Sequence, residues 1–408
     1  MKRTLIVMII SSAFLTNVNA QDDEITRSAL QLNTITTAVP FLSIAPDSRA
    51  GALGDAGVAS SPDANSMHWN IAKLAFIEKE SGISISYSPW LRALVPDISL
   101  SYVSAYKKLG DNSAIGGSLR YFSLGDIKFT NEDGLAIGDF NPAEFAFDVG
   151  YSQKFGRRFS GGIAVRYVRS NLTGGISVQG QDTKAGNAFA ADVGVFYTTE
   201  ETEIFGQDAI LNLGMNISNI GTKISYTDDA IKDFIPINLR FGQSLTFLMD
   251  DHNSIAILTD VNKLLVPTPP VYATDDSGNP ILDDITGEPV IESGKNPDVP
   301  IVTGIFQSFN DAPDGFSEEL REFNISAGLE YWYNKQFAIR AGYFNEHATK
   351  GNRKYITAGL GLKLSVFSID FSYLVALTQQ NPLANTVRFS LKFDFDDFKK
   401  QNQESTSN

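Results

Sequence analysis

The sequence contains no cysteine, which excludes disulfide bonds, thiolate nucleophiles, cysteine-bound metals and a lipoprotein anchor. Histidine is scarce as well, and His68, His252 and His347 do not have the spacing of metal ligands. The formal net charge of −14 argues against nucleic acid as a partner, because binding to phosphates needs a basic surface. We therefore expect no enzymatic activity, no cofactor, no metal site and no nucleic-acid partner.

Long apolar runs are also missing. Beyond residue 20 no apolar run approaches the roughly 18 residues of a membrane-spanning helix. The chain begins with Lys2 and Arg3, followed by the apolar run Leu5–Leu15 and by small residues that end at Ala20. This is the pattern of a secretory signal peptide. We expect residues 1–20 to be removed after Ala20 and the protein to leave the cytoplasm.

Glycine, phenylalanine and tyrosine are abundant, with 33, 28 and 14 residues, and β-barrels use them at tight bends and membrane interfaces. Apolar and polar residues alternate, as from Val387 to Leu391, where Arg388 and Ser390 lie on the opposite face. A period of two predicts strands with one apolar and one polar face. Fourteen segments have this pattern: residues 81–87, 97–106, 113–123, 143–154, 158–169, 187–198, 209–218, 236–247, 253–262, 321–333, 336–344, 354–363, 366–377 and 386–397.

The connections between these segments alternate between short and long, as in 107–112 followed by 124–142. Bacterial membrane barrels have an even number of strands, short periplasmic turns and longer extracellular loops. In a soluble β-sandwich, short and long connections are not expected to alternate in this way. The alternative is a large soluble β-protein with a solvated outer face and an apolar inner one, but the aromatic residues, the signal peptide and the loop lengths favour the membrane.

Charged residues within the segments lie on the face without aromatic side chains. In a membrane barrel that face is the lumen, where charges pair or meet water. The members of this set are Asp148, Arg166, Asp192, Arg240, Asp260, Arg340, Lys363 and Asp370. We predict an all-β fold, a 14-stranded antiparallel transmembrane β-barrel over residues 81–397, embedded in the lipid of an outer membrane. A polar tail follows at 398–408.

The connection 263–320 differs from the rest of the chain in composition. It has eleven acidic residues against Lys263 and Lys295, and eight of the sixteen prolines. This predicts a long, partly mobile extracellular loop. The acidic run 275–284 could bind calcium, although it lacks the spacing of an EF-hand, and a solvated loop is the simpler interpretation.

Aromatic residues in two extracellular loops are candidates for binding a partner. Exposed aromatic side chains on an ordered loop usually form a docking surface, although here they could instead cover the mouth of the barrel. Loop 124–142 is a further candidate for protein contacts. The predicted partner-binding residues are Trp90, Leu91, Phe306, Phe309 and Phe316.

Residues 21–80 precede the first strand, and their glycines are spaced by three. This pattern is neither a dinucleotide-binding nor a phosphate-binding loop, and no strand–helix unit surrounds it. Small residues before a barrel are typical of a plug, because their backbone packs tightly against a lumen wall. We expect a plug in the periplasm-proximal lumen, contacting the wall through Arg49, Gly51, Gly54, Asp55, Gly57, His68, Trp69 and Asn70.

Several motifs resemble the FadL family of outer-membrane proteins and, within it, the PorV family of type IX secretion. The FadL-like motif reads Asn70-Ile71-Ala72 here and lacks the proline of that family. The resemblance to PorV proteins covers essentially the mature chain. The motifs that carry it are Ala45–Ala59, Ser61–Ser66, His68–Asn70, Ser88–Arg92 with Val95–Asp97, and Gly304–Pro313.

The resemblance implies a function in protein secretion. Proteins of this family bind the C-terminal signal domain of cargo that leaves the SprA (Sov) translocon, and carry it to a cell-surface attachment complex containing the sortase-like PorU. The chemistry of signal removal belongs to that partner. A FadL-like channel for hydrophobic small molecules is the alternative, and a purely structural porin is a third interpretation.

Overall fold

The computed structural model describes residues 32–91, 97–130, 136–175, 182–227, 232–378 and 383–396. The expected signal peptide, residues 21–31 of the expected N-terminal segment and the tail 398–408 lie outside this part of the chain. So do residues 92–96 and 131–135 of the two loops that were expected to contact partners.

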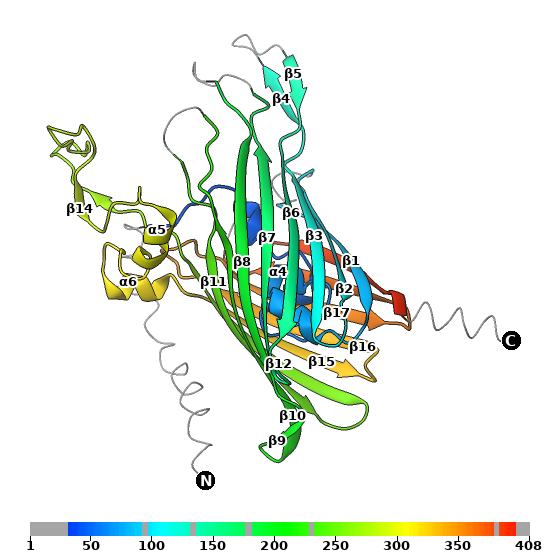
Figure 1. The fold of residues 1–408 in the computed structure, drawn as a ribbon. Coiled ribbons are helices and arrows are strands. Elements are labelled where there is room, and N and C mark those ends of the chain that lie inside the picture. Colours follow the sequence, from blue (N-terminus) through cyan, green and yellow to red (C-terminus); the bar gives the residue numbers. More distant parts are fainter. Residues whose placement is uncertain are drawn as a thin grey trace.

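Fourteen antiparallel strands form a closed barrel (Figure 1), as the alternation in the sequence predicted. The seam between the first and last strands is the pairing of β1 with β19. The ends of the strands differ from the prediction by three residues at most. The barrel strands are β1 (Ser81–Pro89), β2 (Ser99–Lys108), β3 (Ser113–Ser123), β6 (Ala143–Lys154), β7 (Phe159–Asn171), β8 (Gly186–Thr198), β10 (Gln207–Gly221), β11 (Asn238–Leu248), β12 (Asn253–Leu264), β15 (Asn324–Tyr333), β16 (Phe337–Asn345), β17 (Lys354–Lys363), β18 (Phe367–Ala376) and β19 (Thr386–Asp394).

Short elements extend the barrel at both ends. β9 (Thr202–Ile204) pairs with one end of β10, whereas β4 (Ile127–Thr130) with β5 (Ala136–Phe140), and β13 (Val271–Tyr272) with β14 (Ile291–Ser293), form hairpins in long loops. No helix in the described part of the chain is long and apolar enough to cross a membrane. The helices are η1 (Pro40–Ser43), α3 (Ser48–Gly51), α4 (Ser66–Trp69), η2 (Ile71–Phe76), α5 (Ile301–Gln307) and α6 (Phe316–Arg321).

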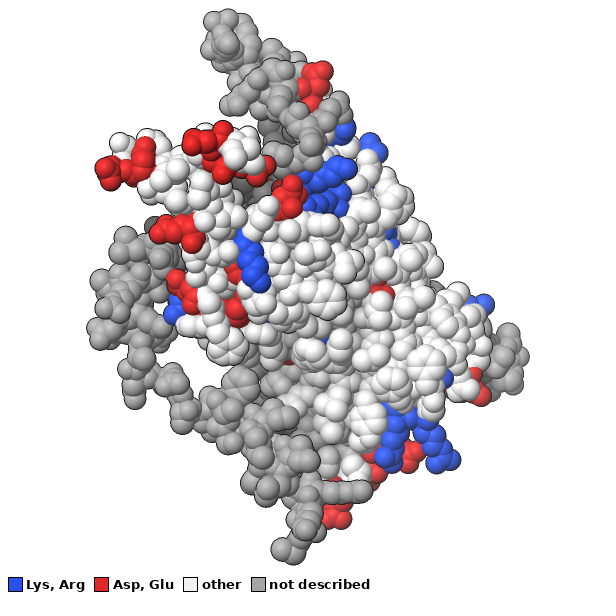
Figure 2. Space-filling view, turned by 60° about the vertical axis from the view of Figure 1, so that its left-hand side comes forward, with Lys and Arg blue, Asp and Glu red and all other residues white. Residues whose placement is uncertain are grey.

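The strands face lipid and lumen alternately. Val165 and Phe189 point outward and are exposed, whereas Arg166 points inward and pairs with Asp148 and Asp192. Figure 2 shows a largely uncharged surface between charged residues that gather toward the two ends of this face. A charged side chain that faces lipid at the middle of the bilayer would cost about 2–4 kcal/mol. This cost explains why the charged residues of the strands point into the lumen.

The two ends of the barrel differ in the length of their connections. Turns such as 334–336, between β15 and β16, form the short-turn end. The opposite end, called here the loop end, carries the connection between β12 and β15, which contains α5 and α6 and projects to one side (Figure 1). Short turns face the periplasm in barrels of this type, so the loop end faces the cell exterior.

Residues 39–77, called here the inner segment, lie inside the barrel. Figure 1 shows α4 enclosed by the strands, and η2 packs against β6, β7 and β8. Apolar side chains of the segment, including Leu53 and Leu74, are fully buried. The core of the molecule is therefore the interface between this segment and the barrel wall.

Candidate functional site

The inner segment is held to the wall by buried ion pairs. Arg49 donates two hydrogen bonds to Glu330 of β15, from Nε at 3.0 Å and from Nη2 at 2.8 Å. The same carboxylate accepts a hydrogen bond of 2.6 Å from Arg340 of β16, so Glu330 pairs with two guanidinium groups. All three side chains are buried. Each arginine also has a second carboxylate partner, Asp63 for Arg49 at 3.4 Å and Asp370 for Arg340 at 2.7 Å, so a network of ion pairs fixes the segment to the wall.

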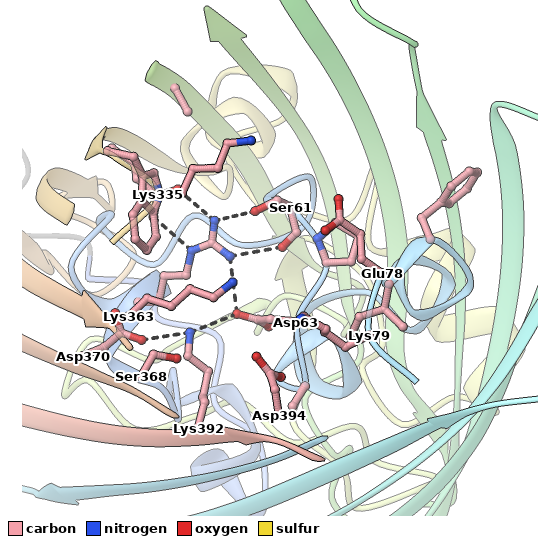
Figure 3. Close-up of a pocket in the computed structure, with 18 of the residues that line it drawn as sticks. Ser61, Asp63, Glu78, Lys79, Lys335, Lys363, Ser368, Asp370, Lys392 and Asp394 are labelled. Atoms are coloured by element: carbon pink, nitrogen blue, oxygen red, sulfur yellow. Dashed lines mark hydrogen bonds and ion pairs between the residues drawn. The ribbon is translucent and has the colours of Figure 1, made fainter. Parts of the chain in front are cut away.

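A second contact joins the inner segment to the last strands. The Lys392 ammonium lies 2.8 Å from Asp370 and 3.6 Å from Asp63, and Figure 3 shows it between the two carboxylates. Asp55 makes a third contact, with its carboxylate 3.3 Å from the guanidinium of Arg388. The charged residues of the segment therefore reach the wall at separate places.

The His-Trp-Asn motif contacts both the wall and the inner segment. Arg120 Nη2 lies 2.5 Å from Nδ1 of His68, and the Asn70 amide donates to a backbone carbonyl of β8 at 2.9 Å. The indole of Trp69 donates instead to Asp47, at 2.6 Å, within the segment itself. Two of the three residues therefore contact the wall by hydrogen bonds, and the third stabilises the start of α3, where Asp47 is the N-cap.

The three glycines of the motif allow close packing rather than phosphate binding. A Cβ at Gly54 would overlap the backbone of Tyr343, and Gly54 has a φ of 67° that disfavours other residues. A Cβ at Gly57 would overlap the ring of Trp69, and one at Gly51 would overlap a guanidinium of β19. Gly54 and Gly57 therefore leave no room for a side chain, whereas at Gly51 the flexible Arg388 side chain would have to shift.

The wall has glycines of its own where it meets the inner segment, a set called here the glycine belt. A Cβ at Gly342 would overlap the backbone nitrogen of Gly54, and one at Gly359 would overlap the methyl group of Ala52. Four pairs of belt glycines lie directly opposite each other on neighbouring strands. Sequence reasoning missed this belt, although glycines near the middle of polar strand faces were its visible signal. Its members are Gly116, Gly150, Gly162, Gly194, Gly214, Gly242, Gly328, Gly342 and Gly359.

A cavity of about 480 Å³ lies below the inner segment, at the short-turn end. Arg49 and Asp63 of the segment line it, together with Lys335 and Lys363 from the strand ends (Figure 3). The sequence placed the plug in the periplasm-proximal lumen, and this placement stays a prediction. The segment begins at the loop end, and the space nearest the periplasm contains this cavity.

The long loop exposes two of the aromatic residues expected to bind partners. Phe306 on α5 is 73% exposed and Phe316 on α6 is 76% exposed, while Phe309 between the helices is half-exposed. Trp90 and Leu91 lie elsewhere, half-buried against the apolar cluster around Phe41 and Leu42 of the inner segment. They help to close the barrel mouth, whereas Phe306 and Phe316 face solvent. Whether any of them binds a partner stays a prediction.

A buried ionic knot, which the sequence did not reveal, fixes α6 to the barrel. Lys263 at the end of β12 pairs with Glu319, at 3.1 Å, and with Glu322. Lys350, from the loop between β16 and β17, pairs with Glu322 at 3.0 Å and with Glu318. These side chains are buried. The acidic composition of the loop is therefore used in part for its own anchoring.

Asp311 lies beside the knot, and no lysine or arginine in the described part of the chain forms an ion pair with it. Its carboxylate accepts a hydrogen bond from the backbone of Thr268 at 3.1 Å, and its own N–H donates to Glu319 at 2.7 Å. Burial, together with the nearby carboxylates of Glu319 and Glu322, raises the pKa of Asp311 to about 6. Glu318 behaves in the opposite way, because although burial opposes it, the Lys350 ammonium holds its pKa below the usual value.

The acidic residues once considered for calcium form local turns. Asp275 accepts hydrogen bonds from the backbone of Ser277 and Asn279, and Asp283 accepts them from Ile285 and Thr286. Among the described residues no group of three or more His, Asp or Glu side chains is placed to hold a metal ion.

Comparisons with solved structures give toluene transporters and a FadL homologue. The structure is similar to the Ralstonia pickettii toluene transporter TbuX, with 11% identity over 85% of this chain and 96% of that chain, and a TM-score of 0.46. The Pseudomonas putida toluene transporter TodX has 12% identity over 89% and 98% of the two chains, with a TM-score of 0.46. A Pseudomonas aeruginosa FadL homologue has 11% identity over 89% and 99%, with a TM-score of 0.45.

A comparison with curated proteins gives no match. A comparison with family models gives one, the type IX secretion system protein PorV, over residues 27–271. The match includes the inner segment and the barrel strands from β1 to β12. Since it spans more than half of the 408 residues, the chain belongs to the PorV family of type IX secretion system proteins.

Proposed function

We propose that this protein binds the C-terminal signal domain of secreted cargo as the cargo leaves the SprA (Sov) translocon. It then carries the cargo to the attachment complex that contains PorU. The proposal rests on membership of the PorV family and on one feature of the structure, the exposed aromatic surface of α5 and α6 at the loop end.

The surface formed by α5 and α6 has properties suited to a protein partner. Phe316 is exposed on α6, which the ionic knot holds in place, and Phe306 is exposed on α5, which packs against the apolar cluster around Phe234. Little conformational entropy is therefore lost when the two rings are buried. Aromatic side chains on a fixed support are typical of interface hot spots. The acidic residues around them disfavour the anionic head groups of a membrane and favour a partner with basic residues.

The alternative, a channel for hydrophobic small molecules, has one observation in its favour. The cavity at the short-turn end is lined in part by apolar side chains, among them Phe76, Phe196 and Trp332. However, the side of the cavity that adjoins the inner segment carries the ion pairs of Arg49 and Lys392. An apolar solute would have to displace paired charges to pass through, so secretion is the better-supported function.

The test replaces the exposed aromatic residues without disturbing the knot. Deleting residues 304–320 would remove Glu318 and Glu319 and leave cations buried, so loss of binding would be ambiguous. The double variant Phe306→Ser and Phe316→Ser avoids this problem. We expect it to fold normally and to lose most of the co-purification with the translocon and with cargo signal domains.

The matched control is Phe205→Ser, which removes a similarly exposed phenylalanine from the turn between β9 and β10 at the opposite end. It should bind partners as the unmodified protein does. Undiminished binding by the Phe306 and Phe316 double variant, with its folding verified, would contradict the assignment of this surface.

A further inference from the structure

We infer that the chain enters its own barrel from the outside, so that residues 32–38, called here the N-terminal arm, lie on the cell-surface side beside α6. The inference concerns the path of the chain and does not depend on which partner binds. It adds the arm to the set of surfaces that the protein presents at its loop end.

The arm is bound by three long loops at the loop end. The backbone N–H of Asn33 donates to the carbonyl of Thr349 at 3.0 Å, in the loop between β16 and β17. Its side-chain amide donates to Glu318 of α6 at 3.0 Å. Further along, Ala38 donates to the carbonyl of Phe234 at 2.9 Å, in the loop between β10 and β11. These contacts place the arm on the side opposite the short turns.

The other end of the inner segment leaves the barrel at the short-turn end. The carbonyl of Glu80 accepts a hydrogen bond of 2.7 Å from the backbone of Lys108, the last residue of β2, and Ser81 then begins β1. Between Asn33 and Glu80 the chain therefore passes from the loop end of the barrel to its short-turn end. β1 runs back toward the loop end along the wall.

The number of times that the chain crosses the membrane makes the position of the N-terminal arm unusual. An even number of strands leaves both ends of a barrel on the periplasmic side. Here the inner segment adds one further crossing, so that Leu32 and the end of β19 lie on opposite sides of the membrane. The buried ion pairs of Arg49, Asp55 and Asp63 hold the segment in this path.

The arm is joined to the helix that carries one of the exposed aromatic residues. Glu318 accepts hydrogen bonds from both Asn33 and Lys350, so the arm shares a carboxylate with the ionic knot. Leu32 is 74% exposed, and Phe316 and Leu320 on α6 are exposed as well. A protein that docks on α6 would therefore also contact the arm.

The absence of cysteine permits a direct test by single-cysteine labelling. The full-length protein carrying Leu32→Cys is treated in intact cells with a PEG-maleimide too large to pass through porins. Ile285→Cys, at a position 93% exposed in the long loop, is the external control, and Glu201→Cys, in the turn after β8, is the periplasmic control. We expect Leu32→Cys to be labelled in intact cells to the extent of Ile285→Cys.

A second variant, Thr34→Cys, repeats the measurement at another exposed position of the arm. A heat-dependent shift in electrophoretic mobility verifies that each barrel is folded. Labelling of both arm variants only after the outer membrane is permeabilised, as for Glu201→Cys, would overturn the inference. Labelling only after denaturation would also overturn it, because the arm would then be enclosed.

Discussion

Glu330 has a central position among the residues that fix the inner segment, because its carboxylate accepts hydrogen bonds from Arg49 of the segment and Arg340 of the wall. The replacement Glu330→Gln keeps the shape of the side chain and removes the charge. Arg49 would keep its longer contact with Asp63, and Arg340 would keep its pair with Asp370, so the cost should be below the roughly 3–5 kcal/mol of a fully broken buried pair. We expect a clearly lower unfolding temperature in detergent.

The control at this scale is Glu200→Gln, which affects the exposed pairs of Glu200 with Arg157 and Arg158. Exposed pairs contribute ~0–1 kcal/mol, so the unfolding temperature should hardly change. Equal shifts for both variants would mean that the pairing of Arg49 does not fix the segment.

At the scale of secondary-structure elements, we expect the anchoring of α6 to depend on pH. The pKa of Asp311 is raised to about 6, so the folded loop binds a proton more tightly than the unfolded loop does. Its contribution to stability is therefore fully present below the unfolded pKa and is lost as the pH rises through about 6. Glu318 has a lowered pKa and opposes this trend only below its usual titration range.

The variant Asp311→Asn tests this dependence. We expect the unmodified loop to show faster amide hydrogen exchange around α6 at pH 7.5 than at pH 5.5, after correction for the intrinsic rates. In the Asn variant the difference should shrink, because no charge forms at the buried site. An unchanged pH dependence would show that another group controls the loop.

The strands and their orientation could be predicted because both depend on a local pattern. Period-two alternation between Val387 and Leu391 is visible within a few residues, and the lipid makes it strict. The pair of Lys263 with Glu322 could not be predicted, since the partners are separated by 59 residues and by a loop without regular pattern. The direction in which the inner segment runs could not be predicted either. Hydrophobic periodicity does not indicate from which end a segment enters the lumen.

Considered as a whole, the molecule is a barrel whose lumen is occupied from the loop end to the middle. We expect the purified protein to give little conductance in planar bilayers. The double variant Arg49→Ala and Asp55→Ala removes two ion pairs between the inner segment and the wall. It should show frequent openings of the channel in the conductance recording. Arg157→Ala, at an exposed position in a short turn, is the control and should stay closed. Large conductance of the unmodified protein would contradict a plug.

The glycine belt also constrains the order in which this membrane protein is assembled. Nine strands lack side chains where they touch the inner segment, so a barrel closed without it would contain a hollow lined by bare backbone. Ion pairs and close backbone contacts distributed around the whole circumference leave no path for threading a segment into a finished cylinder. We therefore expect the segment to be in place before β1 pairs with β19, so that the barrel closes around its own core.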